Sequence, residues 1–461
     1  MITTPAPYPL KGVGMPTWLV RFDKHGACTS PATRAMLLDK LHGAPPSDVI
    51  VFSHGWNYDF DDASNMYAEF LRNFEALSAA HTPNRRFDPV FIGVLWPSVW
   101  MSFDSGPQFA GGDAGHVGSL IAELADRIAT AGGAAGLERV YALLAASSID
   151  DADAAELAEL IAPAFGVIAD EGAASEGRST VAEDVLTMMR AMESVQPGAQ
   201  VEEPVDIDDF GRAADSVVAG TAPAGARVAG VPAWLDPRNA LRLFSLYQMK
   251  DRAGTVGFNG VAALLREVLA ATGAAGIATS TRVHAVGHSF GCKVLLSAIC
   301  AQPLPRPVAS LLLLQPAISH LAFADAVPGS GLPGGYRDAL SADRVTPPIF
   351  STFTRNDRPL HDAFHLAVRR AADLGEAQIA ADGESTSAGP PPSRYAALGG
   401  YGPRRAGQLL IDPLPAAGTS FALPAVAPPI VAFDGSQGLI KGHGDVSGPA
   451  VAWALHRLVF R

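Results

Sequence analysis

Residues Arg282–Ile299, RVHAVGHSFGCKVLLSAI, carry the strongest indication of the fold of this chain. Its first six residues form an apolar run typical of a buried strand, and its last residues are apolar at helical spacing. Between the two runs, Gly287, Ser289 and Gly291 form the motif G-x-S-x-G. A serine on a sharp strand-to-helix turn tolerates little side-chain bulk on either side, which explains the two glycines. The stretch therefore predicts a strand, an exposed nucleophilic serine and a helix in succession.

Short β-branched and aliphatic runs recur along the rest of the chain, and each ends near a turn-forming residue. They are Trp18–Phe22, Asp48–Ser53, Pro89–Trp96, Ser310–Gln315, Pro348–Thr354 and Pro429–Phe433. Candidate helices lie between and after them, at Ala63–Ala80, Gly260–Ala271, Ser289–Cys300, Leu360–Ala372 and Asp445–Val459. Continuous apolar strands that alternate with helices predict an α/β fold with a mainly parallel, doubly wound sheet, covered on both faces.

Two segments interrupt this alternation. We expect residues 1–96 to form the first half of the sheet core and residues 250–461 the second half, with residues 97–249 inserted before the nucleophile strand. An insertion of roughly 150 residues far exceeds the usual loop of roughly 2 to 6, and its periodic apolar segments predict a helical cap. We hypothesise that this cap is a lid that limits access to the site. Residues 375–427 carry GPPPS and ALPAVAPP, which favour a surface loop.

Composition excludes several classes of protein. The net charge is −12 and no cluster of Lys and Arg occurs, which argues against a nucleic-acid partner. The N-terminus lacks a basic stretch followed by an apolar run, so we expect a cytoplasmic protein. The longest uncharged stretch, Pro413–Phe433, contains five prolines, so we expect no transmembrane segment. The three cysteines, Cys28, Cys292 and Cys300, form no CxxC pair and are interpreted as core residues.

A serine hydroxyl is a weak nucleophile until a base removes its proton. In the architecture that the motif indicates, the partners follow the serine in the order acid, then histidine. Asp357 lies just beyond the run PIFSTFT, and His443 lies in KGHGDVSG, beyond the last strand. Both positions are at the carboxyl edge of the predicted sheet. Two alternatives stay open: Asp357 could cap its turn, with Asp325 as the next acid candidate, and His443 could be an ordinary loop histidine.

Acyl transfer also requires donors that stabilise the oxyanion of the tetrahedral intermediate. One predicted donor is the backbone N–H of Phe290, which follows the nucleophile. The second is expected in DVIVFSHGWNYDF, after an early strand, where the amide of Trp56 is favoured and that of Gly55 comes next. The alternative is a purely structural turn in which the glycine permits tight geometry.

Aromatic residues at the ends of these strands are candidates for contact with the substrate. The residues predicted to bind substrate are His54, Trp96 and His288. Apolar walls near the cleft would favour an acyl or other hydrophobic ester group. The alternative is that such residues are ordinary members of the core.

Together these segments resemble the α/β-hydrolase superfamily, and more closely its bacterial members that carry HGW or HGF, WPS, GHSFG, an ND acid turn and a late HGD. In this sequence the motifs begin at Ser53 (SHGW), Trp96 (WPS), Gly287 (GHSFG), Asn356 (ND) and His443 (HGD). The resemblance covers the sheet core but not the two insertions. Lids in this superfamily commonly follow the strand after the nucleophile helix, whereas the large insertion here comes before the nucleophile, so the substrate is not carried over.

The resemblance implies a serine hydrolase of the esterase or lipase type. Ser289 would attack a carbonyl, His443 would accept the proton, and Asp357 would hold the imidazole. An acyl-enzyme would follow, on a small-molecule ester or acyl substrate and with no metal or organic cofactor. An amidase, a peptidase or a thioesterase on the same fold is an alternative, as is a binding protein of this fold without catalysis.

Two patterns typical of cofactor sites are incomplete in this sequence. His361 and His365 have the spacing of a helical metal pair, but HDAFH lacks the glutamate of HExxH and a third ligand, so no metal is predicted. Gly14, Gly106, Gly111 and Gly112 lack the strand-to-helix context of a dinucleotide site. The sequence carries no signal for an oligomeric state.

Overall fold

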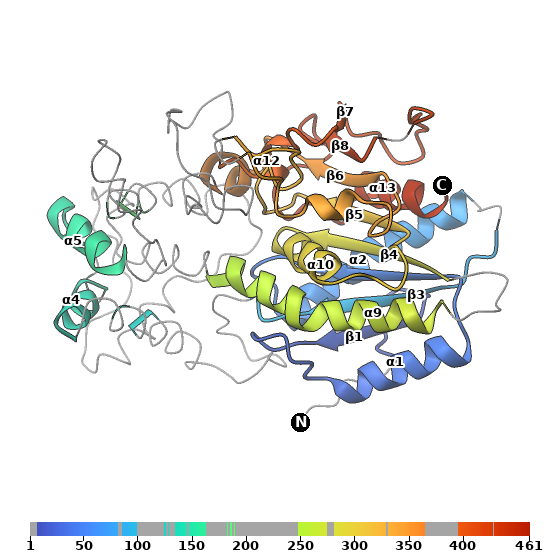
Figure 1. Cartoon of the computed structure of the whole chain (residues 1–461), viewed down its shortest axis with the longest axis horizontal. Helices are drawn as coiled ribbons and strands as arrows, with labels where there is room; N and C mark the ends of the chain where they lie inside the picture. The colour runs from blue at the N-terminus through green and yellow to red at the C-terminus, as the bar shows by residue number, and fades with distance from the viewer. Residues whose placement is uncertain are drawn as a thin grey trace.

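Eight strands form a single sheet in the computed structural model (Figure 1). The structure describes residues 7–81, 85–98, 134–144, 148–162, 248–273, 281–328, 331–364, 395–426 and 428–461, with a few single residues between 124 and 189. The strands are β1 Thr17–Arg21, β2 Asp48–Ser53, β3 Pro89–Leu95, β4 Arg282–His288, β5 Ser310–Leu314, β6 Ile349–Phe353, β7 Leu409–Ile411 and β8 Ile430–Asp434. All neighbouring strands are parallel, which confirms the predicted α/β sheet.

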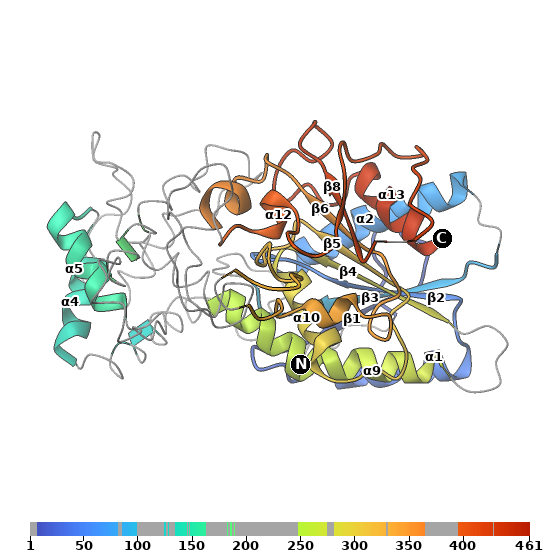
Figure 2. The same ribbon diagram turned by 45° about the horizontal axis from the view of Figure 1, so that its top comes forward.

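Helices cover both faces of the sheet, as Figures 1 and 2 show. One face carries α1 (Pro31–Gly43), the π-helix η5 (Gly257–Val261), α9 (Ala262–Ala271) and α10 (Phe290–Ala301), and the other carries α2 (Phe60–Ala80) and α13 (Pro449–Val459). Side chains of β2 alternate accordingly: Val49 and Val51 pack on the first face, Ile50 and Phe52 on the second. Within the ranges described above, no helix is long and apolar enough to cross a membrane.

The strand order positions the site. It runs β1-β3-β2-β4-β5-β6-β8-β7, which is not the usual α/β-hydrolase order. The chain passes from β2 outward to β3 and returns across β2 to β4, so the direction of winding reverses between β2 and β4. The helices after these strands, α2 and α10, lie on opposite faces of the sheet. Such a reversal opens a crevice at the carboxyl ends of the two strands, which is where open α/β sheets bind ligands.

Most of the inserted segment 97–249, in which a helical cap was expected, lies outside the described residues. Two helices in it are described, α4 (Ala134–Leu144) and α5 (Asp151–Ile161), and they pack against each other. Arg139 of α4 forms ion pairs of 2.6 Å with Asp153 and Glu156 of α5. The described part of the segment thus contains helices, and the proposed lid stays a prediction.

The described part of the segment 375–427 contains regular structure as well as loop. Residues 395–426 include α12 (Leu398–Tyr401) and the edge strand β7, which pairs with β8. Leu398 is buried, and a Cβ atom added to Gly399 would lie 2.5 Å from the carbonyl carbon of Gln315. This stretch therefore packs under the ends of the central strands, where a surface loop was expected. Residues 375–394 lie outside the described part of the chain.

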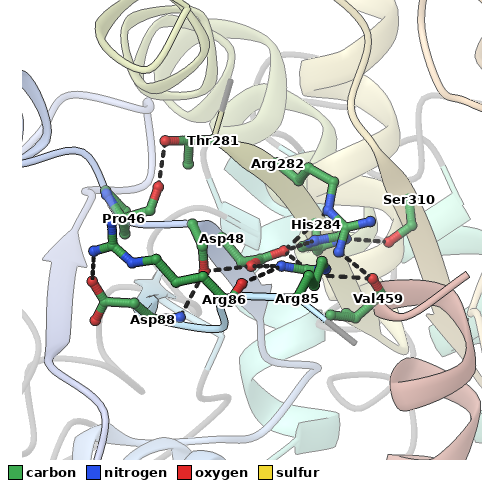
Figure 3. Close-up of polar contacts among 11 residues, drawn as sticks. Pro46, Asp48, Arg85, Arg86, Asp88, Thr281, Arg282, His284, Ser310 and Val459 are labelled. Atoms are coloured by element: carbon green, nitrogen blue, oxygen red, sulfur yellow. Dashed lines mark hydrogen bonds and ion pairs between the residues drawn. The ribbon is translucent and has the colours of Figure 1, made fainter. Parts of the chain in front are cut away.

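A buried charge cluster lies at the amino-terminal edge of the sheet, away from the crevice (Figure 3). The carboxylate of Asp48, on β2, accepts two hydrogen bonds of 2.7 Å from Arg85 and one of 3.3 Å from Arg282. His284 contacts the same carboxylate at 2.9 Å. Burial alone would raise the pKa of Asp48, but the hydrogen bonds from His284 and Arg85 outweigh it, and the pKa lies below its ordinary value. The cluster ties β2 to β4.

Candidate active site

Ser289 lies on the turn between β4 and α10, with a backbone φ of 54° and ψ of −124°. A positive φ is uncommon for a residue other than glycine and is typical of a strained functional turn. The flanking glycines are sterically required. A Cβ atom on Gly287 would lie 2.7 Å from the Cα of Cys292, and one on Gly291 would lie 2.1 Å from the carbonyl oxygen of Ser53. The G-x-S-x-G motif thus forms the strand-to-helix turn that the sequence predicts.

The three residues predicted to form a catalytic triad lie in one line of hydrogen bonds. His443 Nε2 is 2.9 Å from Ser289 Oγ, and His443 Nδ1 is 2.7 Å from Asp357 Oδ2. The other carboxylate oxygen of Asp357 accepts a hydrogen bond of 3.0 Å from the backbone N–H of Leu360, which fixes the carboxylate plane. The Asp357 side chain is fully buried and that of His443 is 25% exposed. The structure brings together residues that are 154 and 86 positions apart in the chain.

Asp325, the other candidate acid, and His456, a histidine near the end of the chain, lie elsewhere. The Asp325 side chain is 64% exposed and forms an ion pair with Arg337. His456, in α13, stacks on Trp453 with an angle of 12° between the rings. Burial lowers the pKa of His456 to about 4. Neither residue contacts the line formed by Asp357 and its partners.

A second chain of serine, histidine and aspartate exists in the amino-terminal cluster of Figure 3. Ser310 Oγ is 2.7 Å from His284 Nδ1, and His284 Nε2 is 2.9 Å from Asp48 Oδ1. None of the three residues is more than 1% exposed. Ser310 also lies inside β5, in register with His284 of β4, and not on a strand-to-helix turn. This chain has the residue types of a triad but lacks an accessible hydroxyl, so we interpret it as structural.

The turn after β2 runs beside the nucleophile because of the strand register. Ser53 of β2 pairs with Gly287 of β4, so the residues that follow each of them leave the sheet side by side. The predicted first oxyanion donor, Phe290, is the first residue of α10. Backbone N–H groups in the first turn of a helix have no intrahelical acceptor, and they point toward the positive end of the helix dipole. The Phe290 amide is therefore oriented for an anion next to Ser289.

Ser98 forms hydrogen bonds with the later residues of the turn that carries the second predicted donor. Its carbonyl accepts a hydrogen bond of 2.9 Å from Asn57 N–H, and its hydroxyl accepts one of 3.2 Å from Tyr58 N–H. The same hydroxyl donates to the Tyr58 carbonyl at 3.0 Å. Asn57 has a positive φ of 61°, so the turn is tight. The backbone N–H groups of Asn57 and Tyr58 are therefore occupied by Ser98. Trp56 and Gly55 remain the candidates for the second oxyanion donor.

His54 stabilises the start of this turn. The backbone N–H of Trp96 donates to His54 Nε2 at 3.2 Å, so Nδ1 carries the proton and donates to the carbonyl of Gly55 at 2.9 Å. The Trp96 indole N–H donates to the His54 carbonyl at 3.0 Å, and the two rings stack with an angle of 9° between them. The hydroxyl of Tyr67 accepts from His54 N–H at 2.9 Å. Burial lowers the pKa of His54 to about 4, so the ring is neutral at pH 7.

The residues predicted to bind substrate are buried in this structure. His54 and Trp96 are 0% exposed and His288 is 1% exposed. The polar atoms of these three residues bond mainly to other protein groups, so the residues stabilise the structure around the site. Contact between these three residues and a substrate stays a prediction. It would require the turn after β2 to open.

Sequence reasoning missed two residues of the site. Ser98 belongs to the WPS motif, and its position just after β3 was the available signal for a contact with the neighbouring turn. Gln315, directly after β5, contacts the loop of His443 and carried no sequence signal. In the ranges that the structure describes, no group of three or more His, Cys, Asp or Glu side chains is arranged to hold a metal ion.

Comparison of the chain with protein-family models, curated proteins and solved structures found no match. The function proposed below therefore depends on the residues of this site and their geometry.

Proposed function

We propose that this chain is a serine hydrolase of the α/β-hydrolase type that cleaves a carboxylic ester. The observation that carries the proposal is the unbroken line of hydrogen bonds from Asp357 through His443 to Ser289, at 2.7 and 2.9 Å. It is supported by the position of the serine on a strained strand-to-helix turn.

In the proposed first step, Ser289 Oγ attacks the ester carbonyl while His443 Nε2 accepts the hydroxyl proton. The positive charge that develops on the imidazole is stabilised by Asp357, whose Oδ2 accepts the Nδ1–H hydrogen bond. Because the Asp357 carboxylate is fully buried, its interaction with the imidazolium is weakly screened by water. The tetrahedral oxyanion would be bound by the amide of Phe290 and by that of Trp56 or Gly55.

The second half of the reaction uses the same groups. The protonated His443 gives its proton to the leaving alcohol oxygen, and the acyl group stays on Ser289. A water molecule then attacks the acyl-enzyme while His443 accepts one of its protons, which releases the acid and restores the serine. The 25% exposure of the His443 side chain allows solvent to reach this face of the imidazole.

The general plan of the sheet supports the proposed α/β-hydrolase fold. A nucleophile at the carboxyl end of a central parallel strand, beside the reversal of strand order, is where an α/β-hydrolase site is expected. The order of the strands departs from the usual one, and the long insertion precedes the nucleophile strand. The fold family is therefore part of the proposal, and the triad geometry is its main support.

The experiment combines labelling with turnover. Wild type, Ser289→Ala and Ser310→Ala are incubated with a fluorophosphonate probe and assayed with p-nitrophenyl esters. Ser310→Ala is the matched control, because its hydroxyl also faces a histidine that contacts an aspartate, but at the buried edge of the sheet. We expect Ser289→Ala to lose labelling and about 10⁴- to 10⁶-fold in kcat, and Ser310→Ala to keep both. Wild-type turnover by folded Ser289→Ala would contradict the proposal.

The class of substrate needs a separate comparison. Wild type is assayed with short-chain esters, long-chain esters, acyl amides and thioesters, and the values of kcat/KM are compared. The proposal expects the highest value for an ester. A preference for amides or thioesters would keep the triad and change the reaction class, whereas a wild type that is neither labelled nor active would point to a binding protein of this fold.

A further inference from the structure

The loop that carries His443 is anchored by the buried side chains of Ile440 and Val446 but is open next to the histidine itself. A Cβ atom added to Gly442 or Gly444 would meet nothing within 4 Å, so the backbone on either side of the histidine faces open space. The imidazole must nevertheless keep two hydrogen bonds of fixed geometry, to Ser289 and to Asp357. The neighbouring glycines contribute no packing at the histidine, so contacts to the main chain of His443 are needed to fix its position.

Two buried side chains hold the main chain at the histidine. His288 Nε2 is 2.9 Å from the carbonyl oxygen of His443. Gln315 Nε2 donates to the same oxygen at 3.2 Å and to the carbonyl of Gly442 at 3.2 Å. His288 is 1% exposed and Gln315 is 0% exposed. The His443 carbonyl therefore has two donors, one for each lone pair, from the ends of β4 and β5.

The orientation of His288 follows from its surroundings. Since Nε2 faces a carbonyl oxygen, Nε2 must carry the proton of this ring. Nδ1 makes no hydrogen bond within the described residues and lies against Gly55, where an added Cβ would be 2.9 Å away. The ring is 1% exposed, and its centroid lies 5.0 Å from that of His443 and 5.8 Å from that of Tyr58. The Nε2–H group of His288 thus points toward the main chain of His443, the proposed base.

The orientation of Gln315 is set by β6. The hydroxyl of Thr352 accepts a hydrogen bond of 3.2 Å from the backbone N–H of Gln315 and donates one of 3.1 Å to its Oε1. With Oε1 occupied by a donor, the amide nitrogen faces the carbonyls of the loop. Gln315 has a positive φ of 37°, which is uncommon for this residue type and indicates a position held by its neighbours.

We propose that His288 and Gln315 are positioning residues that orient the base of the hydrolase by clamping the main-chain carbonyl of His443. This inference rests on the proposed function for its catalytic meaning, but the clamp itself is a property of the folded chain. The two side chains touch neither the nucleophilic oxygen nor a reacting atom, and they act through the loop. Without them, the exposed loop would let the imidazole drift from Ser289 and Asp357.

The kinetic test replaces each donor by an apolar side chain of similar size. In His288→Phe and Gln315→Leu we expect kcat for a p-nitrophenyl ester to fall about 10- to 100-fold with KM nearly unchanged, because a displacement of about 1 Å of a catalytic group costs this much. His288→Gln, whose amide nitrogen can reach the position of Nε2, should recover most of the loss. Gln437→Leu is the matched control, because Gln437 is exposed and bonds only to Asp412 among the described residues.

A second readout does not depend on activity. The proton in the 2.7 Å hydrogen bond between His443 and Asp357 should give a far-downfield resonance in the proton NMR spectrum of wild type. We expect this resonance to broaden or vanish in His288→Phe and Gln315→Leu at unchanged thermal stability, and to persist in His288→Gln and Gln437→Leu. If one variant fails to fold, the other two at positions 288 and 315 still decide the question.

The outcomes separate the two proposals. If wild type is neither active nor labelled by the fluorophosphonate, the proposed function fails, while the NMR signal still tests the clamp. If wild type is active and the folded His288→Phe and Gln315→Leu variants keep its kcat and its downfield resonance, the clamp is refuted and the hydrolase proposal stands. Equal losses in Gln437→Leu would also refute it, because they would show that the effect is not specific to the loop.

Discussion

Gly55 lies so close to Ser289 that a Cβ atom on the glycine would be 2.8 Å from the Cβ of the serine. The same added atom would be 2.9 Å from Nδ1 of His288. Both separations are shorter than any ordinary contact between such atoms. The turn after β2 and the nucleophile turn after β4 therefore fit together only because residue 55 has no side chain, and this close fit brings the turn that carries Gly55 and Trp56 beside the nucleophile turn.

The first prediction follows from this fit. Gly55→Ala should lower kcat for an ester by about 100-fold, because the added methyl group must push the turn away from the serine by a fraction of an ångström to one ångström. The cost in stability should be about 1 to 3 kcal/mol, as for other overpacked sites. Steady-state kinetics and urea unfolding measure the two effects. Gly43→Ala is the control, since an added Cβ there meets nothing within 4 Å.

The second prediction concerns the acid. In Asp357→Asn the amide nitrogen would donate to His443 Nδ1, which moves the imidazole proton to Nε2 and prevents it from accepting the serine proton. We expect kcat to fall about 10⁴-fold at neutral pH, with the fold intact because the amide oxygen can still accept from Leu360 N–H. Asp325→Asn, at the exposed alternative acid, should keep wild-type kcat. Equal losses in the two variants would reject Asp357 as the acid.

Several features of the fold could be predicted because their signals are local. Seven apolar runs each overlap a strand, since strands buried on both faces are continuously apolar. The nucleophile turn was readable because glycines on both sides of a serine, after a strand, satisfy a steric demand that few other contexts impose. Asp357 and His443 were found because each follows a strand at the carboxyl edge of the sheet, in the expected chain order.

Other features depend on contacts that no local pattern encodes. The placement of β3 outside β2 is a matter of long-range pairing, and the three-residue strand β7 lies in a segment whose Pro and Gly content predicts loop. The sequence places His54 and Trp96 at strand ends but does not tell which way their rings face, and the structure turns both inward. The role of Gln315 depends on its contact with a loop 128 residues away.

The third prediction is a pH dependence of stability. Burial lowers the pKa of His54 to about 4 from 6.5, so between these values the unfolded chain binds a proton that the folded chain does not. The free energy of unfolding should therefore fall as the pH falls from 6.5 to 4, by up to about 1.4 kcal/mol per pH unit from this residue. His54→Gln, which can still accept from Trp96 N–H, should show a shallower decline in urea unfolding at a series of pH values.

The control for this experiment is His42→Gln, at an exposed residue of α1. It should leave the pH dependence of unfolding as in wild type. His288 and His456 also have pKa values lowered by burial. The free energy of unfolding of His54→Gln should therefore still fall with pH, but by less than in wild type, because one titrating group is missing. An identical pH dependence in His54→Gln and wild type would show that His54 does not titrate as a buried neutral ring.

The fourth prediction addresses the charge cluster at the amino-terminal edge. Asp48→Asn removes the carboxylate shared by Arg85, Arg282 and His284 and leaves two guanidinium groups without their counter-charge. Breaking a buried ion pair costs about 3 to 5 kcal/mol, and since the arginine side chains are 30% and 31% exposed we expect about 2 to 4 kcal/mol here. Urea unfolding at pH 7 measures the loss.

The pH dependence of this loss identifies its cause. Because the pKa of Asp48 is lowered in the folded state, its contribution to stability is complete above the ordinary value of 3.8 and is lost as the pH falls below it. The difference between wild type and Asp48→Asn should thus be largest at neutral pH and shrink below about pH 4. Asp88→Asn, at a side chain that is 59% exposed and paired with Arg86, should change stability by less than about 1 kcal/mol. A loss in Asp48→Asn that stays constant down to pH 3 would mean that packing, and not the charge, holds β2 to β4 at this edge.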